Sequence, residues 1–189
     1  MPVSWRVDPQ TGLVAGARQR RSPNRDARPA GCEPALIVIH GISLPPGEFG
    51  GPWIDALFSN CLDPAAHPYF AGICQLRVSC HLLIRRDGEL VQYVPLHERA
   101  WHAGESSYAG RRRCNDFSVG IELEGTDERP YDARQYRVLA ELIVALRRAL
   151  PGLRRAPVVG HSHIAPGRKT DPGPAFDWQR LQALLDKVS

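Results

Sequence analysis

The stretch Leu36-Ile37-Val38-Ile39-His40 places four consecutive apolar residues directly before a histidine. A short, uninterrupted apolar run of this length predicts a strand that is buried on both faces. Residues 41–52 follow with four glycines and three prolines, a composition that predicts a loop. His40 therefore stands where a buried strand ends and a long loop begins, and α/β proteins commonly build their sites at such strand ends.

Further segments predict the strands that accompany this one. Residues 78–85 and 90–94 flank an Asp-Gly turn and predict a hairpin. Residues 117–123 alternate between apolar and polar side chains, which is typical of a strand whose two faces differ. Residues 157–160 predict another short strand, directly before a polar loop that is rich in proline.

Helical patterns lie between and after these strands. A short helix is expected over 53–59. Asp132 and Gln135 have the spacing of a capping box, and the leucines after them recur at helical spacing as far as Pro151. Asp177 precedes a last amphipathic helix. This order predicts an α/β (α+β) fold, in which helices flank a central mixed β-sheet.

The length of the chain suits one domain. A chain of 189 residues buries roughly two-thirds of the surface that it exposes when unfolded, so it needs no disulfides to fold. Residues 1–33 are rich in arginine, proline and glycine and show no sustained period. We therefore predict an irregular N-terminal extension over 1–33 and a single domain over 34–189.

The number and spacing of the cysteines indicate the redox state of the compartment in which the protein works. The five cysteines are odd in number and scattered along the chain, which favours reduced thiols over a disulfide framework. No secretory signal is visible, and no apolar run has the length of a membrane span. We therefore predict a cytoplasmic protein with no membrane partner.

The charge of the chain bears on its partners. The net charge is +4, and the arginines gather in two places, over 18–28 and over 111–113. Aromatic residues do not interleave with either cluster, so we predict no nucleic-acid partner. The triplet at 111–113 is better explained by attraction of an anionic substrate. Nothing in the sequence indicates an obligate protein partner.

A second polar stretch, 160–174, complements the histidine at the strand end. It packs His161, His163, Lys169 and Asp171 into a loop with three prolines. Taken alone, His40 fits a structural role at least as well as a ligand role. Together with one histidine and the aspartate of this loop, it makes the ligand set of an open zinc site, with three protein ligands and a water. His161 and His163 compete for the metal, but in an extended loop they point to opposite sides, so we expect only one of them to bind it.

Acid–base and charged residues are needed beside such a metal. Glu122 is a candidate for the carboxylate that activates water, since that carboxylate must lie near the metal without binding it. Glu124 lies on the same face of the predicted strand, so alternation does not choose between the two. Lys169 could stabilise the oxyanion that forms when water attacks a carbonyl.

Two further histidines have open interpretations. His81 lies within a predicted strand and fits a core histidine or a hydrogen-bond partner of a metal ligand. His102 follows Trp101 at the start of a glycine-containing loop, where it could contact substrate or simply pack.

Several strings of the sequence resemble a known family. They lie in the same order as in that family, at 42–50, 84–88, 101–104, 114–118, 120–127 and 160–178. The chain resembles the AmpD-type 1,6-anhydro-N-acetylmuramyl-L-alanine amidases, which act in the cytoplasm in cell-wall recycling of Gram-negative bacteria. The resemblance covers roughly residues 35 to 185. It implies an N-acetylmuramoyl-L-alanine amidase-like fold, shared with phage amidase lysozymes and peptidoglycan-recognition proteins.

The resemblance also implies roles for particular residues. His40, His161 and Asp171 would bind Zn²⁺, Glu122 would be the acid/base residue, and Lys169 would orient water or stabilise the oxyanion. Substrate contacts are expected from a further group of positions, which are Gly41, Trp101, His102, Arg113 and Ala165. The implied substrates are 1,6-anhydro-muropeptides, in which the amide between the lactyl group of N-acetylmuramic acid and L-alanine is hydrolysed.

Two positions depart from the family pattern. Gly41 stands where an asparagine is expected after the first zinc histidine, which could remove a hydrogen bond to substrate. His163 stands where an acidic residue is expected, which could alter the support of the loop or, less simply, the metal ligation.

Two rival functions share this fold. A peptidoglycan-recognition domain binds without cutting, but such domains commonly lack one zinc ligand, and this chain has all three. An amidase that acts on intact peptidoglycan outside the cytoplasm would need an export signal. We therefore favour a cytoplasmic zinc amidase.

Overall fold

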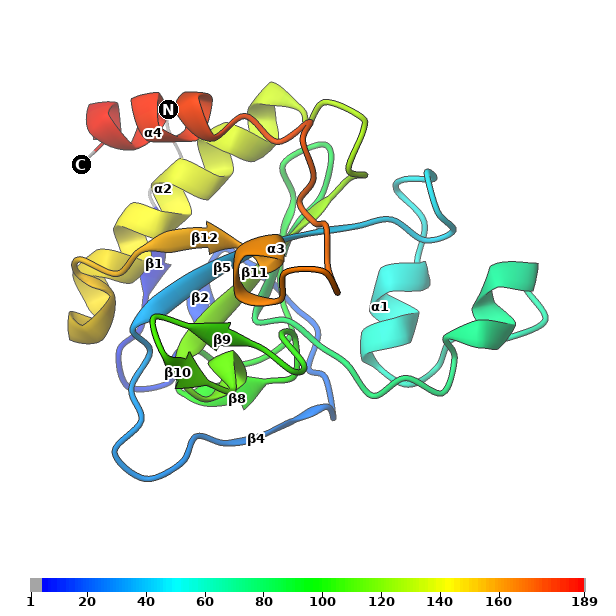
Figure 1. Cartoon of the computed structure of the whole chain (residues 1–189), viewed down its shortest axis with the longest axis horizontal. Coiled ribbons are helices and arrows are strands. Elements are labelled where there is room, and N and C mark those ends of the chain that lie inside the picture. Colours follow the sequence, from blue (N-terminus) through cyan, green and yellow to red (C-terminus); the bar gives the residue numbers. More distant parts are fainter. Residues whose placement is uncertain (1–4, 189) are drawn as a thin grey trace.

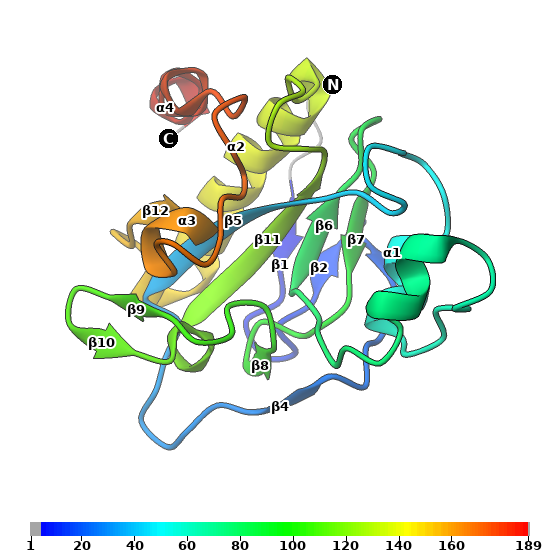
Figure 2. The same ribbon diagram turned by 45° about the vertical axis from the view of Figure 1, so that its right-hand side comes forward.

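A mixed sheet runs through the centre of the molecule in the computed structural model, which describes residues 5–188 (Figures 1 and 2). Within that range its strand order is β12–β5–β11–β6–β7–β3. The strands are β12 (Val158–Gly160), β5 (Leu36–Ile42), β11 (Ser118–Glu124), β6 (Leu82–Ile84), β7 (Leu90–Gln92) and β3 (Arg18–Gln19). Neighbouring strands from β12 to β6 run parallel, whereas β7 returns antiparallel to β6 as the predicted hairpin. The predicted α+β fold with a central mixed sheet is confirmed.

The register of the parallel strands determines which side chains meet. Glu122 on β11 lies opposite His40 on β5, and Gly160 at the end of β12 lies opposite Ile39. His161 follows Gly160 at once, so the chain brings it to the same edge of the sheet as His40. Parallel pairing thus collects residues that are far apart in the sequence at one edge.

Two helices cover one face of the sheet, α2 (Ala133–Ala149) and α4 (Trp178–Val188) (Figure 2). Asp132 and Gln135 form the predicted capping box at the start of α2, and the Asp177 carboxylate accepts the Arg180 N–H at the start of α4. The apolar faces of both helices pack with alternate residues of the central strands into the main hydrophobic core.

The opposite face is covered at its β6–β7 end by α1 (Trp53–Phe58) (Figure 2). Ile54, Leu57 and Phe58 pack there against Leu83 and Val91, which point away from the main core. The remainder of this face, over β5 and β11, is left to loops, and the polar residues of the site lie there.

The other elements are short. They are the strands β1 (Arg6–Val7), β2 (Val14–Ala15), β4 (Arg25–Ala27), β8 (Glu98–Ala100), β9 (Ser107–Tyr108) and β10 (Arg111–Arg112), the helix α3 (His161–Ile164), and 3₁₀ turns at Pro68–Gly72, Cys114–Asp116 and Pro151–Leu153. No helix of the described chain combines the length and the apolar character that a bilayer span requires.

The N-terminal segment differs from the irregular extension that was predicted over 1–33. Its described part, residues 5–33, contains β1 to β4, and residues 1–4 lie outside the described range. β3 adds to the edge of the central sheet beside β7, and β4 pairs with β8. Strands of two or three residues are too short to show a period, and they form here because neighbouring strands offer free backbone groups.

One further prediction needs correction. The strand predicted over 78–85 forms only at Leu82–Ile84, and before it the N–H and the hydroxyl of Ser79 bond to the carbonyls of Trp101 and Asn24 instead of to a neighbouring strand of the sheet. The strand predicted over 117–123 from alternation is confirmed as β11, and every residue of β11 is buried, those of its polar face included. The polar face of β11 is covered by the loops of the site.

Candidate metal centre

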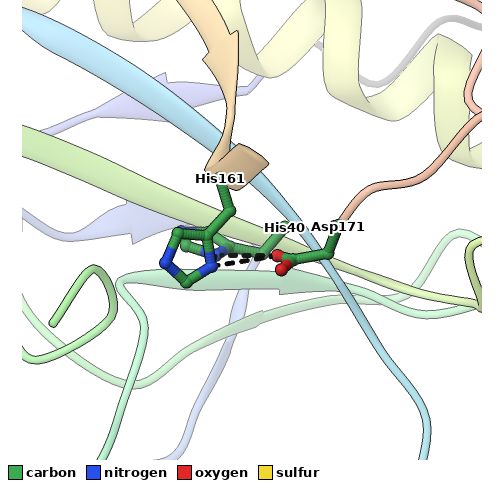
Figure 3. Close-up of side chains that lie close together, drawn as sticks. All are labelled: His40, His161 and Asp171. Atoms are coloured by element: carbon green, nitrogen blue, oxygen red, sulfur yellow. Dashed lines mark hydrogen bonds and ion pairs between the residues drawn. The ribbon is translucent and has the colours of Figure 1, made fainter. Parts of the chain in front are cut away.

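Three side chains from separate parts of the sequence converge at one edge of the sheet (Figure 3). Nδ1 of His40 lies 3.0 Å from Nδ1 of His161, and Oδ2 of Asp171 lies 3.2 Å and 3.1 Å from these two nitrogens. Each residue can offer one ligand atom to the same ion. His40, His161 and Asp171 are called the metal cluster below.

Local backbone structure holds the members of the metal cluster in place. His40 is the fifth residue of β5, and His161 opens α3 directly after β12. The Ser162 N–H donates to the Asp171 carbonyl over 3.0 Å, which folds the loop back so that its carboxylate returns to the histidines. The Tyr131 hydroxyl donates to the Pro172 carbonyl over 3.0 Å and holds the loop from the other side.

The structure brings His161, and not His163, into the metal cluster. The extended loop from which this choice was predicted does not exist, because both histidines lie in α3. Nδ1 of His163 accepts the Gly160 N–H at the start of α3, and its exposed ring lies against Trp178. The acidic residue expected at this position in the family could accept the same N–H, so His163 leaves the ligand set unchanged.

Hydrogen bonding shows that the metal cluster suits a cation. Nε2 of His161 lies 3.2 Å from the Ala103 carbonyl, which can only accept, so the ring proton is on Nε2. In the neutral ring, Nδ1 then points a lone pair at the Asp171 carboxylate. Such facing acceptors repel unless a cation lies among them. Tetrahedral zinc with these ligands has ligand–ligand separations of roughly 3.3 Å, close to those observed. The residues fit Zn²⁺.

The protonation states of the ligands also suit a metal. Burial lowers the pKa of His40 to about 4, so this ring is neutral at neutral pH. Burial alone would raise the pKa of Asp171, but its close contacts with the His161 and His40 rings outweigh this and hold the pKa well below its usual range. Metal ions bind neutral imidazole and ionised carboxylate, which are the forms of His40 and Asp171.

Glu122 lies beside the metal cluster and has an unusual environment. It is buried, and Oε2 meets no hydrogen-bond donor within residues 5–188. Burial, together with the nearby Asp171 carboxylate, raises the pKa of Glu122 well above its usual value, while Lys169 acts in the opposite direction. A buried carboxyl group with a raised pKa beside a metal-ligand set is a candidate for proton transfer.

Glu124, which alternation could not separate from Glu122, is satisfied by its neighbours. Its carboxylate accepts the Gly50 N–H at 2.7 Å and the Arg86 N–H at 3.1 Å, and it pairs with Arg85 at 3.3 Å. The structure therefore separates a bound carboxylate from an unpartnered one on the same strand.

A cavity of about 790 Å³ opens over the metal cluster and Glu122. Lys169, Gly41 and Trp101 line it, and a wall on its far side is apolar, with Leu57, Tyr69 and Leu76 among its residues. Two predicted substrate contacts are not among the residues that line this cavity. Ala165 borders a separate hollow of about 320 Å³. The exposed Arg113 pairs with Asp116 at 3.4 Å.

The sequence profile for N-acetylmuramoyl-L-alanine amidases, Amidase_2, matches residues 30–174. The chain is 62% identical over 178 residues to the 1,6-anhydro-N-acetylmuramyl-L-alanine amidase AmpD of Citrobacter freundii, covering 94% of this chain and 95% of that one. This chain belongs to the N-acetylmuramoyl-L-alanine amidase family. It is 60% identical to AmpD of Escherichia coli K12, over 94% of this chain and 97% of the relative.

Solved structures of this amidase family agree with the fold. The crystal structure of a Se-Met AmpD derivative has a TM-score of 0.91 at 61% identity, and the match covers 95% of this chain and 98% of that one. AmpDh3 of Pseudomonas aeruginosa, solved in complex with an anhydromuramic pentapeptide, has a TM-score of 0.57 at 28% identity, over 80% of this chain and 59% of that one. The protein is thus an amidase of the AmpD type.

Gly41, the first departure from the family pattern in this amidase, lies in β5 directly after His40. A Cβ atom built on Gly41 would come closer to the Tyr131 hydroxyl than real Cβ atoms come to any neighbour. With Gly41, the space beside the metal cluster is thus occupied by the phenol that holds the Pro172 carbonyl.

Sequence reasoning missed several residues that support the amidase site. Tyr131 and the Ala103 carbonyl were not singled out, and neither has a local sequence signal of its function. His102 was predicted to contact substrate. It borders the cavity, but its side chain is buried and both ring nitrogens are occupied, Nδ1 by His40 and Nε2 by Ser118.

Proposed function

We propose that this amidase is a zinc enzyme that hydrolyses the amide between the lactyl group of 1,6-anhydro-N-acetylmuramic acid and L-alanine. The observation that carries the proposal is the convergence of three metal-ligand atoms beside the buried Glu122 carboxyl group, whose Oε2 meets no donor among residues 5–188. The names of the relatives support the substrate, since those with about 60% identity are 1,6-anhydro-N-acetylmuramyl-L-alanine amidases.

His40, His161 and Asp171 would hold the zinc ion through Nδ1, Nδ1 and Oδ2. A bound zinc ion supplies Lewis-acid polarisation of the amide carbonyl and lowers the pKa of water to about 7. Three protein ligands would leave one position of a tetrahedral zinc ion open for water or substrate. The complete ligand set favours a hydrolase over a domain that only binds peptidoglycan.

Glu122 would act as the general base and then as the general acid. Its carboxylate accepts a proton from the attacking water as the new C–O bond forms. It passes that proton to the nitrogen of L-alanine as the C–N bond breaks, which turns the amine into a good leaving group. The raised pKa of Glu122 suits both steps, because the group can hold the proton between them.

Lys169 would stabilise the negative charge that develops on the carbonyl oxygen. It lines the same cavity as Glu122 and the metal cluster, and its backbone N–H is anchored to the Ala165 carbonyl at 3.0 Å. An exposed lysine at the cavity rim can approach the substrate as it binds. Trp101 and the apolar wall of the cavity would position the sugar and lactyl groups.

We infer that the reaction belongs to peptidoglycan recycling in the cytoplasm, with the catalytic domain over 34–189. The five cysteines of the chain are all free in the structure, two of them buried, which suits a reducing compartment. Although residues 5–33 precede the catalytic domain, they contribute β3 to its sheet.

Mass spectrometry of the reaction products tests the proposal. Anhydro-muropeptide is incubated with the protein after chelation, and again after zinc is restored. We expect release of free anhydro-muramic sugar and intact peptide only with zinc, and circular dichroism should show that the chelated protein stays folded. The same peptide on a non-anhydro sugar measures the sugar preference. Equal turnover in metal-free protein would exclude the zinc mechanism.

A further inference from the structure

A chain of hydrogen bonds runs from the metal cluster into the interior of the protein. Nε2 of His40 lies 2.9 Å from Nδ1 of His102. Nε2 of His102 lies 3.0 Å from the Ser118 hydroxyl, which lies 2.5 Å from the Cys114 carbonyl. All three side chains are buried, so their hydrogen bonds depend on one another.

The carbonyl at the inner end fixes the direction of the whole chain. The Cys114 carbonyl can only accept, so Ser118 must donate its single hydroxyl proton there. Ser118 then accepts from His102, which places the proton of the neutral His102 ring on Nε2. Nδ1 of His102 is left as an acceptor, and His40 must donate to it from Nε2. Nδ1 of His40 therefore carries a lone pair, and it points at His161 and Asp171.

The surroundings of His102 hold its ring in position and favour its neutral form. The partners of its two ring nitrogens are an imidazole and a hydroxyl, and a positive charge on a buried ring with such partners is unfavourable. The Asn115 side-chain oxygen accepts the N–H groups of His102 and Ala103, at 3.1 Å and 2.8 Å, and anchors the backbone. Gly120 leaves room for the ring, since a Cβ built there would lie 2.5 Å from Cγ of His102.

We propose that His102 is a positioning residue that fixes the tautomer of His40, so that Nδ1 of His40 is free for the metal. His161 obtains the same tautomer from the Ala103 carbonyl, without an intermediate side chain. The proposal rests on the proposed zinc site, but the tautomer itself is a property of the metal-free protein. Because both ring nitrogens are engaged, His102 has no free ring nitrogen to offer a substrate.

The tautomer of His40 is measurable without metal. In the full chain stripped of zinc, long-range ¹H–¹⁵N correlation of the imidazoles distinguishes protonated from unprotonated ring nitrogens. We expect His40 to be protonated at Nε2 alone in the wild type. His102→Leu removes the acceptor, so a mixture of both tautomers is expected. His102→Asn offers an amide oxygen near the position of Nδ1 and should restore the Nε2 form. Protonation of wild-type His40 at Nδ1, or an unchanged tautomer in His102→Leu, would refute the proposal.

Zinc affinity gives a second measurement, by competition with a chromophoric chelator. Loss of a hydrogen-bond partner of a metal-binding histidine typically weakens binding roughly 10- to 100-fold. We expect this loss for His102→Leu and most of the affinity to return in His102→Asn. A wild-type zinc affinity in His102→Leu would contradict the proposal. Absence of zinc binding in the wild type would instead overturn the proposed function and leave the tautomer result standing.

A matched pair of serine variants covers the case in which His102→Leu does not fold. Ser118→Ala breaks the chain one step further in. Ser79 is as buried, and its hydroxyl likewise donates to a carbonyl, that of Asn24 at 2.7 Å, and accepts one N–H, that of Trp101 at 3.0 Å. We expect Ser118→Ala to give mixed His40 tautomers and weaker zinc binding, and Ser79→Ala to change neither. Equal behaviour of the two variants would show that only generic packing is involved.

Discussion

Two buried polar clusters lie along β11 and differ in how well their groups are satisfied. One is the metal cluster with Glu122 beside it. The other, called the arginine cluster here, consists of Asp55, Arg85 and Glu124. Glu122 and Glu124 are two residues apart on the same strand, and both are buried. The difference between them therefore comes from their partners and not from their depth.

In the arginine cluster each charge meets an opposite charge or a donor. Arg85 pairs with Glu124 at 3.3 Å and with Asp55 at 3.4 Å. Asp55 also accepts from the Tyr93 hydroxyl and from Arg18. These contacts tie α1 and the loop before it to the sheet. A buried charge network in which the groups are paired serves to hold elements together.

In the metal cluster, by contrast, acceptors face acceptors. Nδ1 of His161 points at the Asp171 carboxylate, and Glu122 has a buried oxygen that no donor within residues 5–188 reaches. Such groups raise the free energy of the folded protein unless a ligand satisfies them. The unsatisfied cluster coincides with the proposed active site, whereas the satisfied cluster ties elements of the fold together.

The largest effect is expected from Glu122→Gln. Removing the group proposed to transfer protons should lower kcat by 10² to 10⁴-fold, the usual contribution of general acid–base catalysis. The free energy of unfolding should stay the same or rise, since the variant removes an ionisable group from a buried position without donors. Steady-state kinetics and urea denaturation measure the two quantities. Normal kcat would exclude Glu122 from the mechanism.

Glu124→Gln should have the opposite effect, a loss of stability with little change in kcat. It leaves the Arg85 guanidinium with one fewer carboxylate, and breaking a buried pair in this way costs about 3 kcal/mol of stability. Zinc affinity should not change, and kcat should change less than tenfold in folded protein. Urea denaturation and chelator competition test this. A large loss of kcat with unchanged stability would show that the division into a structural and a functional cluster is wrong.

Lys169→Met tests the proposed role of the lysine at the rim of the cavity. Loss of one electrostatic donor to a developing oxyanion costs about 2.7 to 4 kcal/mol in the barrier, or 10² to 10³-fold in kcat. Lys169 is exposed, so stability and zinc affinity should remain close to those of the wild type. Lys187→Met, at an exposed position in α4, is the matched control and should leave kcat unchanged. If both variants keep normal kcat, Lys169 does not contact the oxyanion.

The sequence was sufficient where a local pattern determines the structure. The apolar run before His40 predicted β5, and the capping box at Asp132 predicted the start of α2, because periodicity and capping act within a few residues. Residue types also predicted that His40, Asp171 and one of two histidines could meet as a zinc site, and the family resemblance selected His161, which the structure places with the other two.

Other features depend on contacts between distant segments and could not be predicted. Glu122 and Glu124 have the same local pattern, and only the approach of Arg85 and the Gly50 backbone separates them. His102 gave no sign that it would pack on His40, because this requires the space that Gly120 leaves on β11. The short strands of residues 5–33 likewise exist only through their partners.

The smallest effect is expected from His81, a buried histidine that belongs to neither cluster. Its Nδ1 accepts the Gly120 N–H at 3.0 Å, and its Nε2 faces the Glu98 carbonyl at 3.1 Å. Burial, and then the charge of Arg28, lower the pKa of His81 from 6.5 to about 3. The folded protein therefore keeps this ring neutral where the unfolded chain takes up a proton. Stability is fully present above pH 6.5 and falls as the pH drops towards 3, by up to about 1.4 kcal/mol per pH unit.

His81→Asn isolates this contribution, because the amide oxygen can accept the Gly120 N–H but does not titrate. Urea denaturation of the zinc-free protein between pH 7 and pH 4.5 should show that the free energy of unfolding falls less steeply with pH in the variant than in the wild type. The two slopes should differ by about 1.4 kcal/mol per pH unit, the value for one bound proton. The variant should be less stable at pH 7, since it fills less of the core. Identical slopes would mean that His81 is protonated in the folded protein. Burial and hydrogen bonding would then not be enough to keep a histidine of this fold neutral, and the same argument for His40 in the metal cluster would be weakened.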